Sequence, residues 1–174
     1  MEFNLQSAID EVVAIAKAQA AQKNIRLISD TAKEQIVFED KQMVNTIMRN
    51  LISNAIKFTP LGGTVVVSVA RSNHHCEISV KDTGIGIPEE HIPHIFNIER
   101  KYNAIGTSNE SGTGLGLILC REFVVDHGEK FWAESKYGKG TTFTFTIPWV
   151  NDLEEKASVI ILFLQKTRHF SLKT

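Results

Sequence analysis

The sequence predicts an α+β fold, a two-layer α/β sandwich whose mixed, mostly antiparallel sheet is covered on one face by about three helices. Three observations lead to this prediction. Helical periodicity recurs along the chain, alternating apolar segments pair as hairpins, and glycine-rich turns separate the two kinds of segment. The length of 174 residues fits one domain with additional residues at its ends.

Three long segments have the spacing of amphipathic helices. Good helix formers fill the positions between their apolar residues. The first stripe contains Leu5, Ile9, Val12, Val13 and Ala16. The second contains Val44, Ile47, Met48, Leu51, Ala55 and Phe58. We therefore expect helices at 5–22, 41–58 and 115–127, and a shorter amphipathic segment at 89–96.

The strands are marked by short apolar runs and by alternation. Two short strands are expected at 25–28 and 36–38. Two hairpins are expected, one from 64–70 and 76–81, and the other from 130–134 and 141–147. The polar stretch 97–112 lies between two glycine-rich turns, and an irregular segment of this length inside a domain indicates a mobile lid.

Composition excludes several classes of protein. The chain is 43% hydrophobic and 22% charged with a net charge of −1, which argues against a nucleic-acid binder or a basic membrane-surface protein. Cys76 and Cys120 have apolar neighbours and no metal-ligand spacing, so we interpret them as buried free thiols. Neither a signal peptide nor a membrane-length apolar run is visible, so we expect a soluble, cytoplasmic protein.

Three polar residues lie on one stripe of the helix 41–58. The offsets of four and three bring Asn50, Asn54 and Lys57 together at the edge of its apolar face. An amide oxygen suits Mg²⁺ when a triphosphate supplies the negative charge, and a lysine meets phosphate as a point charge. For this helix in isolation, a solvated polar face is the alternative.

The turn Asp82-Thr83-Gly84-Ile85-Gly86-Ile87-Pro88 follows a predicted strand. By alternation, Asp82 shares the apolar side of that strand with Cys76, Ile78 and Val80. A buried carboxylate needs donors, and the exocyclic amine of a purine would provide one. Gly84 and Gly86 would let backbone approach a flat base. The alternative is an Asp that merely starts a glycine turn.

A second glycine-rich segment, Gly112-Thr113-Gly114-Leu115-Gly116-Leu117, opens the third helix. Backbone N–H groups at a helix N-terminus form a natural phosphate site. The Gly-x-Gly-x-Gly motif alone is weak evidence for phosphate binding, because it is neither a Walker A loop nor a dinucleotide-binding fingerprint in a βαβ unit.

Taken together in this order, the three elements resemble the family of gyrase, heat-shock chaperone, histidine kinase and mismatch-repair ATPases. Within this family the motif sequences are most similar to those of histidine kinases. Residues 50–60 resemble their N box, and residues 82–88 and 112–117 resemble their two glycine boxes. Ile95-Phe96 resembles a reduced F box. The resemblance covers about 3–148. It implies a catalytic, ATP-binding domain at 1–149 with a lid at about 97–112, followed by an unassigned tail at 150–174.

The resemblance also implies roles for individual residues. Asn54 would be the principal Mg²⁺ ligand, with Asn50 beside it, and Lys57 would bind a phosphate. Asp82 would accept a hydrogen bond from the exocyclic amine of adenine. Thr141 would support adenine recognition through its hydroxyl. In the lid, Lys101 and Arg100 could reach the γ-phosphate and Tyr102 could cover the base. The complete set of implied nucleotide contacts is Asn50, Asn54, Lys57, Asp82, Gly84, Gly86, Ile87, Lys101, Tyr102, Thr113, Gly114, Leu115, Gly116 and Thr141.

The implied reaction is transfer of the γ-phosphoryl group of ATP to a histidine, with Mg²⁺ as the metal. None of the six histidines has the context of a phosphoacceptor, and none precedes Asn50. The resemblance thus implies a separate dimerisation and phosphoacceptor domain and a downstream response regulator or receiver domain as partners. It implies no nucleic acid and no membrane contact by this domain, although the parent protein could be anchored in a membrane.

Two alternatives stay open at this point. One is an ATPase of the same superfamily that couples hydrolysis to dimer closure, which would need further catalytic residues from a downstream domain. The other is a nucleotide-binding regulatory module without transfer activity. Two departures from the family pattern, the reduced F box and Glu129 in place of a glycine, do not touch the nucleotide motifs.

Overall fold

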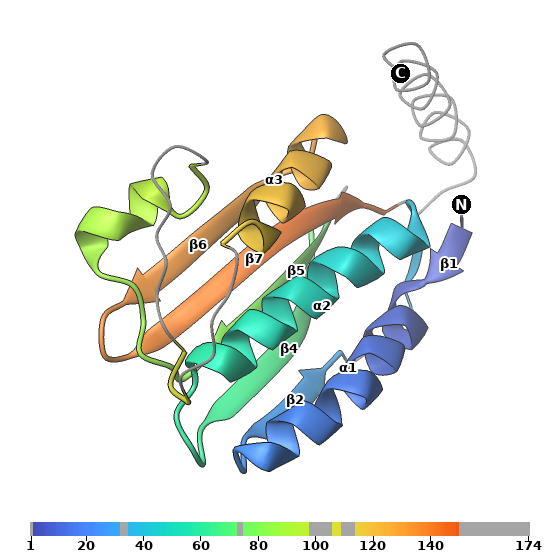
Figure 1. The fold of residues 1–174 in the computed structure, drawn as a ribbon. Coiled ribbons are helices and arrows are strands. Elements are labelled where there is room, and N and C mark those ends of the chain that lie inside the picture. The colour runs from blue at the N-terminus through green and yellow to red at the C-terminus, as the bar shows by residue number, and fades with distance from the viewer. Residues whose placement is uncertain (1, 32–34, 73–74, 98–105, 109–113, 150–174) are drawn as a thin grey trace.

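The computed structural model describes residues 2–31, 35–72, 75–97, 106–108 and 114–149. Two layers make up this part of the chain, a twisted sheet and three helices that cover one of its faces (Figure 1). The helices are α1 (Leu5–Gln22), α2 (Lys41–Phe58) and α3 (Gly116–Asp126), with a 3₁₀ helix at Glu89–His94. The strands are β1 (Glu2–Asn4), β2 (Arg26–Asp30), β3 (Ile36–Phe38), β4 (Thr64–Arg71), β5 (His75–Asp82), β6 (Phe131–Lys136) and β7 (Gly140–Pro148).

The main sheet has five strands in the order β2-β4-β5-β7-β6. Only the β2–β4 pair is parallel, because α2 provides the crossover between these two strands, and the other pairs are antiparallel. The predicted fold class and both hairpins are therefore confirmed. The strand β1 was not predicted. It pairs with β3 in a separate two-stranded sheet, so 36–38 forms a strand as expected but outside the main sheet.

Local sequence signals fix the helix boundaries. Asn4 accepts a hydrogen bond from Ser7 N at the start of α1. Asp40 accepts two, from Gln42 N and Met43 N, at the start of α2. The α2 helix ends before Pro60, and the Thr59 hydroxyl donates back to the Ala55 carbonyl oxygen at 2.7 Å.

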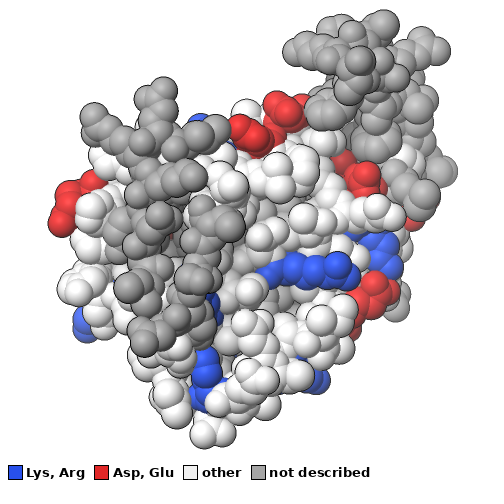
Figure 2. Space-filling view, in the orientation of Figure 1, with Lys and Arg blue, Asp and Glu red and all other residues white. Residues whose placement is uncertain are grey.

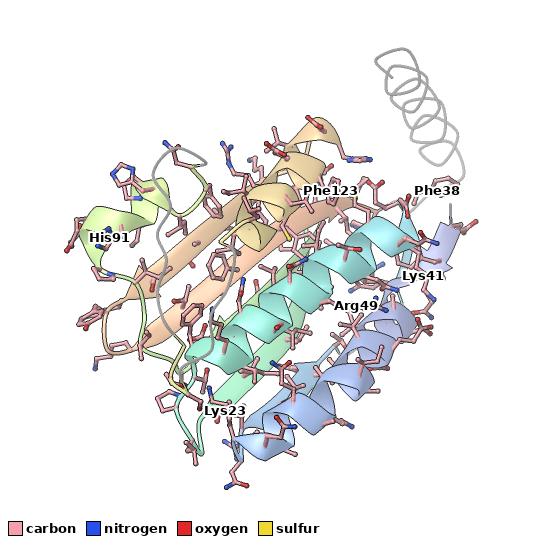
Figure 3. The ribbon with its side chains drawn as sticks, in the orientation of Figure 1. Lys23, Phe38, Lys41, Arg49, His91 and Phe123 are labelled. Carbon is pink, nitrogen blue, oxygen red and sulfur yellow. The ribbon has the colours of Figure 1, made fainter. Side chains whose placement is uncertain are left out.

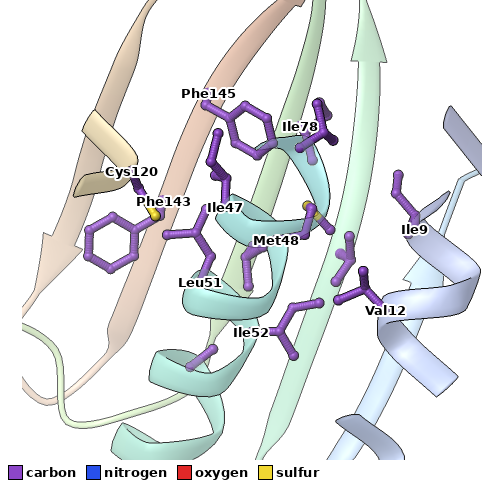
Figure 4. Close-up of a cluster of buried hydrophobic side chains, with 14 of the residues drawn as sticks. Ile9, Val12, Ile47, Met48, Leu51, Ile52, Ile78, Cys120, Phe143 and Phe145 are labelled. Carbon is purple, nitrogen blue, oxygen red and sulfur yellow. The ribbon is translucent and has the colours of Figure 1, made fainter. Parts of the chain in front are cut away.

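The hydrophobic core lies between the helices and the sheet (Figure 4). In α2, the first five residues of the predicted stripe are buried, whereas Phe58 is only half-buried. Ile52 and Ile56 are fully buried although the stripe omitted them. The reason is that α2 packs against α1 as well as against the sheet, which widens the buried face of the helix beyond one stripe. Cys76 and Cys120 are buried free thiols, as predicted.

Charges of both signs are interspersed on the helical face of the molecule (Figure 2). One of the ion pairs joins Lys41 of α2 to Glu11 of α1 at 2.9 Å, on the surface. Within the described residues, no helix combines the length and the apolar character needed to cross a membrane. Most of the predicted lid, at 98–105 and 109–112, and the predicted tail at 150–174 lie outside the described residues.

Candidate functional site

The polar stripe of α2 meets the start of α3 at Asn50. Asn50, Asn54 and Lys57 are all half-buried, as expected for the edge of a packed helix face. The amide of Asn50 is oriented by its own helix, because Nδ2 donates to the Thr46 carbonyl oxygen at 2.9 Å. Its Oδ1 atom therefore points away from the helix backbone and toward Gly116.

The start of α3 is shaped to lie against Asn50. A Cβ atom on Gly116 would come within 2.6 Å of Asn50 Oδ1, closer than side-chain atoms approach each other, so only glycine fits without a shift. Leu115 occupies the N-cap position and gives no side-chain capping bond. The first N–H groups of α3 have no partner within the helix, which leaves a partial positive charge beside the Asn50 amide of α2.

Asp82 closes the other end of the site. It is 6% exposed at the end of β5, on the apolar side of that strand, which confirms the prediction from alternation. Its Oδ1 atom accepts hydrogen bonds from Gly84 N at 2.7 Å and from Thr141 N at 3.1 Å. Burial raises the pKa of the carboxyl group to about 6, although the two backbone bonds oppose the shift.

The first glycine turn is fastened to the end of α2. Ile85 N donates to the Phe58 carbonyl oxygen at 3.1 Å. A Cβ atom on Gly84 would lie 2.5 Å from that same oxygen, and one on Gly86, which has a φ of +68°, would overlap the Lys136 carbonyl oxygen. The glycines are thus required for close packing of the turn against α2 and the β6–β7 connection. Contact with a flat base stays a prediction for both.

Ser135 links the elements around Asp82, although its local sequence does not distinguish it from other polar strand residues. Its Oγ atom accepts from Ile87 N at 2.8 Å and lies 2.8 Å from Thr141 Oγ1 and 3.1 Å from the Gly140 carbonyl oxygen. A serine between Glu134 and Lys136 resembles any polar strand residue. The only signal was its place on the same side of the strand as Ala133 and Phe131.

The structure brings the predicted residues together in two groups. Asp82, Gly84, Gly86, Ile87 and Thr141 form one group around the buried carboxylate. Asn50, Asn54 and Lys57 form the other along one stripe of α2, where Asn50 meets Gly116 at the start of α3, and Gly114 and Leu115 directly precede α3. The ammonium group of Lys57 lies 4.9 Å from the centroid of the Phe58 ring. The predicted contacts Lys101, Tyr102 and Thr113, together with Arg100, lie outside the described residues.

The donor set fits a hard divalent cation that brings its own anionic partner. Asn50 and Asn54 provide neutral amide oxygens, which suit Mg²⁺ when phosphate oxygens and water complete its coordination. In the described ranges, no three His, Cys, Asp or Glu side chains gather to form a metal site. His91 and His94 lie half-buried on the 3₁₀ helix.

Comparison with known proteins agrees with this geometry. Residues 39–151 match the family described as "Histidine kinase-, DNA gyrase B-, and HSP90-like ATPase". This region contains both glycine turns and the whole of α2. Because the match covers well over half of the chain, the chain belongs to this family of ATP-binding domains.

The similar proteins include several sensor kinases. The chain is 40% identical over 118 residues to sensor histidine kinase WalK of Bacillus subtilis, covering 67% of this chain and 19% of WalK. It is 36% identical over 145 residues to the adaptive-response sensory kinase SasA of Rippkaea orientalis, covering 82% of this chain and 36% of SasA. The chain thus spans about a fifth to a third of these relatives.

Among solved structures, the chain resembles the catalytic domain of histidine kinase ThkA in its nucleotide-free form. The TM-score is 0.73 at 30% identity, and the likeness covers 87% of this chain and 98% of that one. ShkA in complex with AMPPNP has a TM-score of 0.74 at 22% identity, over 87% of this chain and 31% of ShkA, which shows a shared fold.

Proposed function

We propose that residues 1–149 form the catalytic domain of a cytoplasmic histidine kinase module, which binds Mg-ATP and transfers its γ-phosphoryl group to a histidine. The single observation that carries the proposal is that one site combines an end suited to a nucleotide base with an end suited to phosphate. A buried carboxylate lies at one end. At the other end, the Asn50 amide of α2 faces the N-terminus of α3, and Asn54 and Lys57 lie on the same stripe of α2.

At the first end, Asp82 recognises adenine. Its Oδ1 atom is already engaged by Gly84 N and Thr141 N, so Oδ2 is the atom that accepts the exocyclic amine. A purine with a carbonyl group at that position would place an acceptor against the carboxylate and would be rejected. Ser135 holds the Thr141 hydroxyl in place, and this hydroxyl binds the ring through water.

At the second end, the chain holds the triphosphate. Asn54 and Asn50 would hold Mg²⁺, which would supply neutralisation of the charge on the phosphate oxygens. Lys57 leaves its contact with the Phe58 ring to meet a phosphate. The N–H groups at the start of α3 bind a phosphate directly, while Lys101, Tyr102 and Thr113 in and beside the lid complete the site. Such a reaction depends on positioning and charge neutralisation more than on covalent help.

The nucleophile is a histidine on a separate dimerisation and phosphoacceptor domain, and the phosphoryl group then passes to a response regulator. ThkA has been solved in complex with response regulator protein TrrA, and that structure resembles this chain with a TM-score of 0.71 at 30% identity, covering 86% of this chain and 42% of ThkA. Membership of the family and the similarity to WalK and SasA support an equivalent partner for this chain.

A transfer assay tests the proposal. The chain is mixed with a separately produced phosphoacceptor domain and γ-labelled ATP, and the label is examined for the acid lability and alkali stability of phosphohistidine. We expect transfer by the wild-type chain and none by Asn54→Ala, which also loses Mg²⁺-dependent ATP binding. Gln42→Ala is the matched control, because Gln42 is exposed on the same helix.

Two outcomes would contradict the proposal. If ATP binds but no histidine is labelled, the chain is a nucleotide-binding module or an ATPase, and phosphate release distinguishes these two. If Asn54→Ala binds ATP with the Mg²⁺ dependence of the wild type, the ligand assignment on α2 is wrong.

A further inference from the structure

A buried lysine outside the two groups joins the end of α2 to Thr107, in the described part of the predicted lid segment. Lys23 follows α1 directly and is only 7% exposed. Its ammonium group donates to the carbonyl oxygens of Ile56 and Lys57, both at 3.0 Å, and to Thr107 Oγ1 at 2.6 Å. Figure 3 shows Lys23 where the end of α1 approaches the end of α2.

The contacts of Lys23 suit the end of a helix. The last carbonyl groups of α2 have no N–H partner within the helix, and they carry the negative end of its dipole. An ammonium group placed there donates hydrogen bonds to these carbonyl groups and also neutralises the negative end of the dipole. This arrangement explains how a charge can be tolerated in a buried position.

Thr107 also contacts carbonyl groups at the end of α2, and it shares that of Lys57 with Lys23. Its backbone N–H donates to the Lys57 carbonyl oxygen at 3.1 Å. Its hydroxyl lies 2.9 Å from the Thr59 carbonyl oxygen and 3.2 Å from that of Lys57. Residues 106–108 are thereby fixed to the end of α2, and the Lys57 carbonyl oxygen is the point where Lys23 and Thr107 meet.

This meeting point lies directly behind the phosphate end of the site. Lys57 is the residue whose side chain faces phosphate in the proposed function, so its backbone position sets the reach of its ammonium group. Only five residues separate Ser108 from Gly114, so the attachment of Thr107 also limits where the start of α3 can lie. We propose that Lys23 and Thr107 are positioning residues for the triphosphate, a role that rests on the proposed function.

Substitutions that keep the size of the side chain but remove its polar group distinguish a positioning role of Lys23 and Thr107 from simple packing. Replacing the ammonium group by an apolar side chain of similar size keeps the packing but removes the donor to the Ile56 and Lys57 carbonyl oxygens, so some loss of stability is expected and is measured separately. Lys23→Met fills the same volume but leaves Thr107 attached only through its own bonds. Thr107→Val keeps the backbone N–H bond and the shape while it removes the hydroxyl.

The test compares nucleotide binding and folding in the same chain. Calorimetric titration with Mg-ATP gives the affinity at the phosphate end, and NMR titration with adenosine gives that at the adenine end, where Asp82 is unchanged. For Lys23→Met we expect Mg-ATP affinity to fall about tenfold, which corresponds to about 1.4 kcal/mol. Adenosine affinity should change by less than about twofold, because adenosine lacks the groups that the α2 end binds.

Thr107→Val should also weaken Mg-ATP binding, and the double variant should bind no more weakly than Lys23→Met because the two residues act as one unit. Hydrogen exchange at the Thr107 amide should speed up in Lys23→Met. Lys17→Met is the control, since Lys17 is an exposed lysine of α1. Thermal unfolding confirms that each variant is folded, and Thr107→Val keeps the test decisive if Lys23→Met does not fold.

Each contrary result has its own meaning. Folded Lys23→Met and Thr107→Val chains that bind Mg-ATP like the wild type would overturn this inference alone. Equal losses of Mg-ATP and adenosine binding would also overturn it, because they would show a general structural role. A wild-type chain that binds no Mg-ATP would overturn the proposed function and this inference with it.

Discussion

Replacing Asp82 by asparagine should stabilise the chain without ATP and abolish its response to ATP. The carboxyl group is 6% exposed, and burial raises its pKa from 3.8 to about 6. In Asp82→Asn, the amide oxygen can still accept from Gly84 N and Thr141 N, as the carboxylate does now. The amide nitrogen then replaces the free oxygen, so the site presents a donor where the adenine amine also donates.

The magnitude follows from the shift in pKa. Because the folded chain holds the proton more tightly than the unfolded chain, the wild type loses stability as the pH rises from about 4 to about 6. Above pH 7 the loss is complete, and a difference of about two units corresponds to about 3 kcal/mol. The asparagine carries no charge, so it avoids this loss. For a chain of this size, the difference equals a rise of about 6 to 12 °C in Tm at most.

Thermal unfolding at pH 4.5 and pH 7.5, with and without Mg-ATP, measures both effects. We expect Asp82→Asn to unfold at a higher temperature than the wild type at pH 7.5, and the gap to shrink at pH 4.5. Saturating Mg-ATP should raise the Tm of the wild type only, since a ligand stabilises the state that binds it. Glu122→Gln is the control, because it removes an exposed carboxylate.

Two results would refute this reasoning. An Asp82→Asn chain that is no more stable than the wild type at pH 7.5 would show that burial of the carboxylate carries no cost. A variant that is more stable but still stabilised by Mg-ATP would show that Asp82 does not recognise adenine.

Two further substitutions probe the geometry at each end. Gly116→Ala places a Cβ atom 2.6 Å from Asn50 Oδ1, so the amide must rotate. Stability should change by less than about 1 kcal/mol because alanine favours the helix, whereas calorimetry should show at least about a tenfold loss of Mg-ATP affinity. Unchanged affinity would mean that Asn50 has no part in binding. Ser135→Ala removes the acceptor for Ile87 N, which should lower the free energy of unfolding in urea by about 1–3 kcal/mol. An unchanged urea midpoint would show that Ser135 does not hold the turn.

The elements that carry their own periodicity were predictable from the sequence. The α2 helix, both hairpins and the inward direction of Asp82 follow from spacing that any reader of the chain can count. The grouping of Asp82 with Thr141 could not be predicted from local spacing, because 59 positions separate the two residues. The family resemblance predicted that grouping, and neither residue's local sequence would have done so.

What the sequence could not predict are the contacts that depend on tertiary packing. The burial of Ile52 and Ile56 requires that α1 lie beside α2, which no single-helix pattern contains. The pairing of β1 with β3 joins two strands of three residues each, too short to show alternation. Lys23 resembles an ordinary lysine at the end of its own helix, and only the fold shows that it caps a different one.

The end of α2 is where the separate parts of the site are joined. The Phe58 carbonyl oxygen accepts from Ile85 N of the turn that follows Asp82. One residue earlier, the Lys57 carbonyl oxygen accepts from Thr107 N and from Lys23 Nζ. Because Lys57 and Phe58 are adjacent, the turn after Asp82 and residues 106–108 are both attached to the last residues of α2. Each attachment uses a different carbonyl oxygen, so loss of the Lys23 contact leaves the bond from Ile85 N to the Phe58 carbonyl oxygen in place. This separation is why Lys23→Met is expected to affect the phosphate end of the site and to spare the adenine end.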